Sequence, residues 1–471
     1  FWIVHGFLVD FIQSIFFKIF GLNWNSYVIH SSLFNLIIAI FSFKTFKYLE
    51  IGEFKAFLLS ICISVLAYPV SGTPFLDLHS AFFSVISIYL LIFYIKTNNN
   101  SYLFFAVISF GLAFLCKQVP AAYTIIGITF FLAYYSYKIK SFNPIKFSIL
   151  GIISFLTILI IFLEMVNINL NDFFFQLVVF PASIAQDRYT NYHLNFNNVF
   201  LDFKFIYLFL FSIIILLKKK IFQEKNFSIK EFHLFLVILI FSVALIYHQI
   251  FTKNQIFIFF IIPILCAFLL SVVQATKIKK KLYFEILFLL ICFFSTFKFH
   301  ERFNIDRKFH ELVDTNLESG VEINFKKDFF KGLRWISPNF KNANDEINEI
   351  ENFYDKLQND KRNKILISNY SFYSALLNEK LYSPSRTFDK ISYPQKGSEF
   401  YEKYKNFFKK NINENKIESI YVFYTEKEID MDFLNLVIFN YLPDNCLKIN
   451  HSSKYLRHFN ILNCEYLKNY E

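Results

Sequence analysis

The sequence predicts an α-helical polytopic membrane protein of roughly ten transmembrane helices, followed by a small C-terminal α/β soluble domain. Hydrophobic residues make up 55% of the 471 residues, and the chain contains 68 Phe. Its mean hydropathy is +0.39, whereas a soluble protein needs a more polar surface. The apolar residues lie in long blocks as far as residue 298 and become sparse afterwards. These observations separate a membrane domain from a soluble one.

The apolar blocks are interpreted as helices, because a backbone within the hydrocarbon core must satisfy its hydrogen bonds internally. The stretch 102–137 is divided in two. As one helix it would be about 54 Å long, and the hydrocarbon core is only about 30 Å thick. Segments 7–20 and 172–185 are amphipathic and are expected at the membrane interface. The predicted spans are 28–47, 55–71, 76–96, 102–116, 118–137, 147–166, 203–217, 231–249, 254–274 and 281–297.

The distribution of basic residues predicts the orientation of the spans. One set of alternate loops carries sixteen Lys, and the other set carries five Lys or Arg. The first set is therefore expected to be cytoplasmic, which places the 167–202 loop and the C-terminal domain outside. The net charge of +11 follows from these short basic loops, so no nucleic-acid partner is expected.

The predicted domain organisation has three parts. Residues 1–298 form the transmembrane domain, 299–345 a linker with short helices, and 346–471 an extracytoplasmic α/β domain in which helices alternate with strands. The chain begins at Phe1 rather than Met. We therefore expect the first span and the start of the first outer loop to be missing.

The cysteines agree with this topology. Cys446 and Cys464 both lie in the soluble domain, and we expect them to pair in an oxidising compartment; two free thiols remain the alternative. The other four cysteines lie in predicted spans and are interpreted as small apolar residues.

Polar residues near the membrane are candidates for function, because burying them in lipid is costly. Each has a structural alternative. Asp77 suits the start of a helix, Lys117 can snorkel from its turn, and Arg188 can join a loop salt bridge. In the predicted topology the candidates all face outward. They are His5, Asp10, Asp77, His79, Lys117, Arg188, His248 and Lys253.

Several segments resemble GT-C membrane glycosyltransferases of the protein O-mannosyltransferase and aminoarabinose-transferase type. The stretch HGFLVDFIQSIFFKIFGLNWNSYVIHSSLF, residues 5–34, resembles the end of their first luminal loop. His5 takes the place of the family's His or Lys, and Gly21 that of its Gly. Gly6 and Phe7 stand where the family has Pro-Pro.

Three later segments carry the same resemblance, which covers residues 1–298. Asp77 lies in SGTPFLDLHSAFFSVISIYLL, like the Asp that opens a family span. Lys117 lies in GLAFLCKQVPAAYTI, like the family's Gly-Leu-Ala-x-Leu-x-Lys turn. The segment from His248 to Pro263 resembles the late span with a polar entry and an inner Pro.

The resemblance implies transfer of a sugar from a polyprenyl-phosphate-linked donor to a lipid, glycan or protein acceptor. The chain would then be a multi-pass protein, contacting membrane lipids, of a bacterial inner membrane, with its C-terminal domain in the periplasm. The family's general base is an acidic residue early in the first luminal loop, which we expect to precede Phe1.

Roles for the candidates follow from this chemistry. Asp77 and Asp10 are the catalytic candidates, since transfer needs a carboxylate. A divalent metal with His79 as ligand is a further expectation. The leaving lipid phosphate needs cationic or hydrogen-bonding partners, for which the candidates are Lys117, Arg188, His5, His248 and Lys253.

Other functions remain open from the sequence. A polysaccharide polymerase or ligase would show several Arg in a long outer loop, and the 167–202 loop has one. A transporter or flippase of lipid-linked sugars would place its polar residues near the midplane, often on broken helices. A structural anchor would not explain why polar residues gather at one face.

Overall fold

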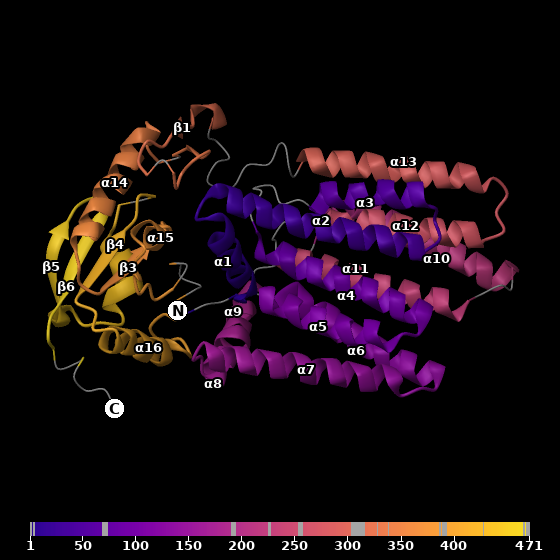
Figure 1. Cartoon of the computed structure of the whole chain (residues 1–471), viewed down its shortest axis with the longest axis horizontal. Coiled ribbons are helices and arrows are strands. Elements are labelled where there is room, and N and C mark those ends of the chain that lie inside the picture. Colours follow the sequence, from indigo (N-terminus) through magenta and orange to yellow (C-terminus); the bar gives the residue numbers. More distant parts are fainter. Residues whose placement is uncertain are drawn as a thin grey trace.

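The computed structural model contains a long helical bundle with an α/β domain at one end (Figure 1). It describes every residue except 1, 3–4, 68–73, 190–194, 225–227, 253–257, 303–315, 327, 338, 386–387, 389–392, 427, 465–466 and 468–471. The side chains of 185–189, 198, 223–224, 252 and 317 are also not described.

The bundle contains one helix for each of the ten predicted spans. Within the described residues, seven helices are long and apolar enough to cross a membrane. The chain is therefore an integral membrane protein of predominantly helical fold, as predicted. The helices are α2 (Trp24–Tyr48), α3 (Glu53–Ala67), α4 (Leu76–Thr97), α5 (Asn100–Cys116), α6 (Gln118–Ile139), α7 (Asn143–Met165), α10 (Lys204–Lys219), α11 (Ile229–Thr252), α12 (Ile261–Ala275) and α13 (Lys281–His300).

The bundle has a buried centre and an apolar exterior. Most side chains of α4 and α12 are buried, whereas few of those of α7 are. α7 presents side chains such as Ile153, Leu156 and Ile158 to its surroundings. An exterior of this kind is stable in lipid but would be an aggregation hazard in water. α4 and α12 are therefore helices on which a buried site can be built.

The two ends of the bundle differ in their loops. The end distant from the α/β domain (Figure 1) carries the basic turns that the sequence predicts to be cytoplasmic. Several of their charges are paired. Lys96 Nζ lies 3.6 Å from Glu50, Lys220 Nζ contacts Glu231, and Lys55 contacts Glu285.

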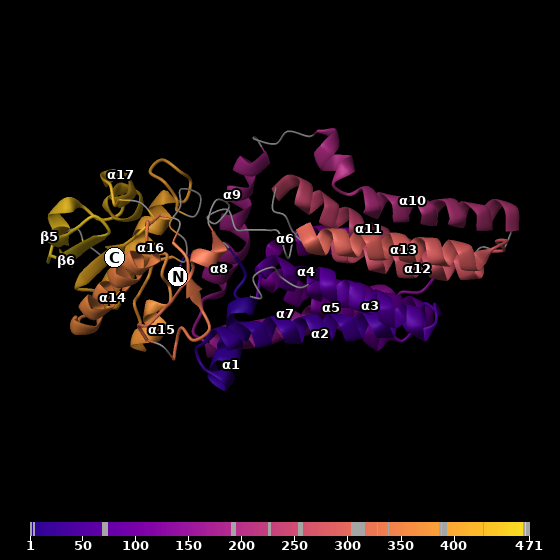
Figure 2. The ribbon, with the colours of Figure 1, turned by 90° about the horizontal axis from the view of Figure 1, so that it is seen from above.

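Short helices lie between the bundle and the α/β domain (Figure 2). α1 (Leu8–Phe20) covers most of the predicted segment 7–20. The segment 172–185 is covered by α8 (Leu170–Phe174), the π-helix η1 (Phe175–Val179) and α9 (Phe180–Tyr189). Trp2 packs between Phe180 and Tyr404, at centroid distances of 4.8 and 5.1 Å. Trp2 is thus part of the core of the α/β domain.

The α/β domain has a four-stranded sheet in the order β3-β4-β6-β5, with β3 and β4 parallel and the other neighbours antiparallel. α14 (Ala343–Asn359) and α15 (Tyr373–Leu377) pack on one face. α16 (Tyr401–Glu414) and α17 (Met431–Leu434) pack on the other. The strands are β3 (Lys364–Ser368), β4 (Ser419–Phe423), β5 (Leu447–Ser452) and β6 (Leu456–Ile461).

The described residues 316–337, within the predicted linker, pack against the α/β domain. The short strands β1 (Val321–Glu322) and β2 (Arg334–Trp335) pair antiparallel. Ile323 and Phe330 pack with Ile347 of α14, and Trp335 Nε1 donates a hydrogen bond of 2.9 Å to Glu346 Oε2. The described residues 316–337 therefore belong with the α/β domain.

Candidate active site at the covered end of the bundle

A buried ion pair joins α4 to the turn between α5 and α6. Lys117 Nζ lies 2.6 Å from Asp77 Oδ1 and 2.7 Å from Asp77 Oδ2. The side chains of Asp77 and Lys117 are 4% and 11% exposed. At this burial each charge needs its partner, because desolvation of a lone charge costs several kcal/mol. The sequence-predicted candidates Asp77 and Lys117 are thus brought together directly.

Local structure fixes both members of this pair. Asp77 lies in the first turn of α4, where the helix dipole favours a carboxylate. Lys117 is extended (φ −156°, ψ 133°) and separates α5 from α6. Its carbonyl accepts a hydrogen bond of 3.1 Å from Ser80 Oγ, and Gln118 Nε2 donates to Leu177 O at 2.7 Å. The turn is therefore held on both sides.

His248 of α11 completes a cluster of three polar side chains. Its Nε2 atom lies 3.6 Å from Asp77 Oδ1, and its side chain is fully buried. α4, the α5–α6 turn and α11 thus each contribute one member, which we call the Asp77 cluster. A carboxylate flanked by an ammonium and an imidazole can orient the ammonium or bind a further donor.

A second polar chain runs beside the Asp77 cluster. His79 Nε2 lies 3.1 Å from His30 Nε2, and His30 Nδ1 lies 2.8 Å from Gln13 Oε1. His79 Nδ1 is also 3.0 Å from the carbonyl of Phe75. This chain connects α4 through α2 to α1. His30 and Gln13 were not among the residues predicted from the sequence; a polar residue within an apolar helix was the available signal.

The expected metal has no evident site among the described residues. Nowhere in that part of the chain do three His, Cys, Asp or Glu side chains come together. His79 meets a single further candidate ligand, His30, where at least three protein ligands are usual for zinc. Metal ligation by His79 therefore stays a prediction, and no step is derived through it.

The remaining predicted residues have different outcomes. His5 and Asp10 line a cavity below the α/β domain. Arg188 lies in α9, but its side chain is outside the described part of the structure. Lys253 falls in 253–257, which is also outside it.

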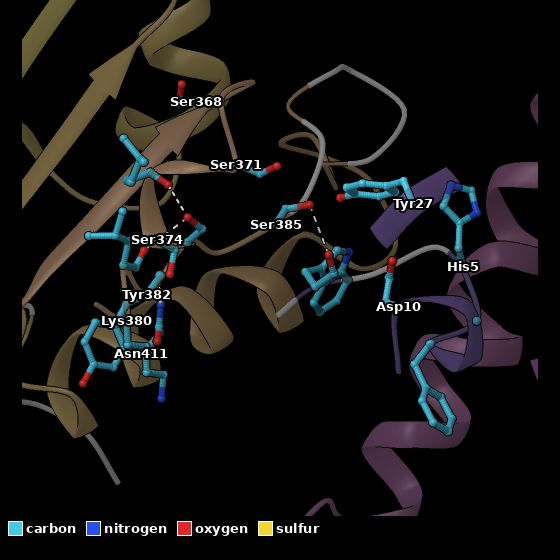
Figure 3. Close-up of a pocket in the computed structure, with 16 residues that line it drawn as sticks. His5, Asp10, Tyr27, Ser368, Ser371, Ser374, Lys380, Tyr382, Ser385 and Asn411 are labelled. Carbon is cyan, nitrogen blue, oxygen red and sulfur yellow. Dashed lines mark hydrogen bonds between the residues drawn. The ribbon is translucent and has the colours of Figure 1, made fainter. Parts of the chain in front are cut away.

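The cavity lies between the N-terminal segment and the α/β domain and has a volume of about 760 Å³. Figure 3 shows His5, Asp10 and Tyr27 on one side and the serine-rich edge of the α/β domain on the other. The sequence analysis did not single out these serines, because isolated Ser residues in a polar domain carry no signal. The lining residues are Trp2, His5, Gly6, Phe7, Asp10, Tyr27, Leu366, Ser368, Ser371, Ser374, Lys380, Leu381, Tyr382, Ser383, Ser385 and Asn411.

Gly6 connects this cavity to the Asp77 cluster. A Cβ atom at Gly6 would lie 1.8 Å from the carbonyl oxygen of Leu115, two residues before Lys117. The backbone that lines the cavity therefore rests directly on the end of α5. Only glycine permits so close an approach.

One family of known proteins is similar to the N-terminal part of this chain. Residues 4–162, about a third of the chain, match the family model described as dolichyl-phosphate-mannose-protein mannosyltransferase. The predicted resemblance to this glycosyltransferase family is confirmed. The matched segment includes Asp77 and Lys117, and the match supports a membrane glycosyltransferase that uses a lipid-linked sugar.

The solved structures similar to this chain include the crystal structure of ArnT from Cupriavidus metallidurans in the apo state. The TM-score is 0.47 and the identity 11%, over 100% of this chain and 89% of that chain. No curated protein matches the sequence.

Proposed function

We propose that the protein transfers a sugar from a polyprenyl-phosphate-linked donor to an acceptor at the end of the bundle covered by the α/β domain. The observation that carries this proposal is the buried Asp77–Lys117 pair within the family-matched segment. Charged residues inside a membrane bundle are costly and mark functional sites. The acceptor belongs to one of three classes, lipid, glycan or protein.

The covered end is proposed to be extracytoplasmic, in the periplasm of a bacterial inner membrane. Two observations support this orientation. The basic turns lie at the opposite end of the bundle, as the positive-inside rule requires for the cytoplasmic side. Cys446 and Cys464 form a disulfide, and disulfides persist in oxidising compartments.

In the proposed reaction an acceptor hydroxyl attacks the anomeric carbon of the donor sugar. The bond from that carbon to the phosphate oxygen breaks, and polyprenyl phosphate leaves. The acceptor's proton passes to a carboxylate, for which Asp10 is the proposed residue because it lines the cavity. Lys117 is proposed to stabilise the leaving phosphate, and Asp77 to position Lys117.

Further phosphate contacts are proposed for His248 and for three residues on the outer segments, His5, Arg188 and Lys253. His248 is the member of this set that the structure places beside Asp77. These side chains would share the negative charge of the phosphate with Lys117, since several hydrogen bonds to one anion strengthen its binding.

The test is transfer of radiolabelled sugar from a panel of polyprenyl-phosphate donors by the full chain in membrane vesicles. We expect Lys117→Ala and Asp77→Asn to reduce transfer to below about 1%, the loss of roughly 3 kcal/mol seen when a transition-state contact is removed. Lys220→Ala is the matched control. It removes a buried Lys with two carboxylate contacts, of 2.7 and 2.5 Å to Glu231, at the opposite end, and should keep transfer.

The outcomes separate the candidate functions. Near-normal transfer by either Asp77→Asn or Lys117→Ala would remove that residue from the site. If no donor supports transfer by the correctly inserted wild-type protein, a polymerase or a transporter of lipid-linked sugars would account for the fold instead.

A further inference from the structure

The cavity below the α/β domain has hydrogen-bonding groups of mixed type along one wall. The hydroxyls of Ser374, Ser383 and Ser385 donate to the carbonyls of Glu379, Leu366 and Trp2. A hydroxyl that donates its only proton keeps its oxygen lone pairs as acceptors. These three serines therefore present acceptors toward the space that they line.

Other groups on the same wall are donors. Ser368 Oγ accepts a hydrogen bond of 3.1 Å from the Tyr370 N–H, which leaves its own proton available to a ligand. Lys380 supplies an ammonium, lying 4.6 Å from the centroid of the Tyr382 ring. Ser371 is exposed and can act either way. The wall thus carries both acceptors and donors.

This pattern indicates the chemistry of the ligand. A phosphate offers acceptors only, so the acceptor oxygens of Ser374, Ser383 and Ser385 would not recognise it. His5, a proposed phosphate contact, lies on the opposite side of the cavity (Figure 3). Recognition of a multiply charged anion also relies on clustered Arg and Lys, and Lys380 is the one cation of these types among the residues that line the cavity. A saccharide carries hydroxyls that donate and accept at once.

The size and surroundings of the cavity agree with such a ligand. Its volume of about 760 Å³ lies within the range of roughly 300 to 1,000 Å³ of small-molecule sites. The side chains of Phe7, Tyr27 and Tyr382 add apolar surface, on which the C–H faces of a sugar ring can pack. Asp10 faces the serine wall from α1 (Figure 3), where it could take a proton from a bound hydroxyl.

We infer that this cavity binds the acceptor, and that the acceptor is a saccharide or carries one at its reactive end. The identification of the ligand as the acceptor of the reaction rests on the proposed function. The binding of a saccharide stands on the cavity alone. Gly6 lines the cavity and lies against the Leu115 backbone, so the cavity adjoins the segment that leads to Lys117.

Saccharide binding can be measured without transfer. Saturation-transfer NMR on the full chain in detergent would use a panel of free hexoses, N-acetylhexosamines and their disaccharides. We expect signals from at least one sugar, lost in Ser371→Phe, which fills the cavity, and reduced at least threefold in Lys380→Met. Excess inorganic phosphate should not displace it. The matched control, Ser453→Phe, adds the same ring on the exposed β5–β6 turn and should keep the signals.

Each result decides between the two proposals. No sugar signal, a signal unchanged in both cavity variants, or displacement by phosphate would overturn the saccharide site. Sugar binding without transfer from any donor would sink the proposed function and leave the site standing. Where transfer is observed, Ser371→Phe should raise the acceptor KM at least tenfold and leave the donor KM unchanged.

Discussion

Two buried lysines of this protein, Lys117 and Lys220, each contact both oxygens of a carboxylate, at opposite ends of the same bundle. Lys220 lies just after α10, and its partner Glu231 follows eleven residues later in α11. Glu231 is 26% exposed, whereas Asp77, the partner of Lys117, is 4% exposed. The same pair of groups thus joins residues eleven positions apart in the sequence at one end and forty positions apart at the other.

The surroundings of the two pairs differ more than the pairs themselves. Beside Asp77 lie His248 at 3.6 Å and, further along α4, the His79–His30 contact. The Lys117 turn also adjoins the backbone that lines the cavity. A charge pair contributes little net stability once desolvation is counted, so its geometry alone does not indicate function. Function is indicated instead by the further polar groups that lie around the Asp77–Lys117 pair.

The largest expected effect is the loss of transfer when both members of the Asp77–Lys117 pair are made neutral. Lys117→Ala alone should destabilise the protein by about 3 to 5 kcal/mol, because it leaves Asp77 buried and uncompensated. Asp77→Asn combined with Lys117→Met should restore most of that stability, since a neutral pair needs no partner charge. Transfer should stay below about 1% of wild type, because the charge itself acts on the phosphate.

Thermal unfolding in detergent and the transfer assay check this prediction side by side. Lys220→Met combined with Glu231→Gln is the control and should preserve both stability and transfer. Recovery of transfer in the neutral Asp77–Lys117 variant would mean that the two ends carry equivalent structural pairs, and the comparison would fail.

A smaller effect is expected from the disulfide, which tests whether the covered end depends on the stability of its α/β domain. Cys446 and Cys464 are 18 residues apart, and closing a loop of that length contributes roughly 3 kcal/mol. Replacing both by Ser should therefore make the α/β domain more sensitive to protease, while the bundle stays folded. Limited proteolysis with and without reductant measures this, and reductant should have no further effect on the double variant.

The sequence predicted the bundle well because each span carries its own signal. Length and hydropathy place ten helices without reference to their neighbours, and the basic loops add the orientation. Because the signal of each span is independent of its neighbours, contacts between spans were not predicted. His30 and His79 meet because α2 and α4 pack at one register, and nothing within either helix encodes that register.

The candidate site was predicted in part for a related reason. Asp77 and Lys117 were expected at one face because both lie at span ends, but their direct contact depends on how the α5–α6 turn folds back onto α4. In the fold, the segment 316–337 was predicted as a linker because two buried apolar residues, Ile323 and Phe330, give too weak a sequence signal for packing. The serine wall of the cavity is assembled from short loops of the α/β domain, so it appears only in three dimensions.

The smallest expected effect concerns a partly exposed cluster in the α/β domain, which extends the comparison beyond the membrane. Asp360 and Arg362 pair at 2.8 Å. Although burial raises the pKa of Asp360, hydrogen bonds from Arg362 and Tyr421 bring it well below its usual range. Burial and the nearby Arg362 lower the pKa of His458 to about 4. Lys356 and His451 contribute to this lowering of the pKa, whereas Asp360 opposes it.

The two shifts act in separate pH windows. Below pH 6.5 the unfolded chain protonates His458 while the folded chain does not until about pH 4, so stability falls as the pH drops between these values. The loss should be about 1 to 2 kcal/mol, allowing for solvent screening. The contribution of Asp360 is lost only below its usual pKa near 4. Unfolding of the α/β domain within the full chain, followed by proteolysis from pH 7 to 4.5, should therefore show a slope that His458→Gln removes. A slope that persists in this variant would assign the pH dependence of stability to groups other than His458.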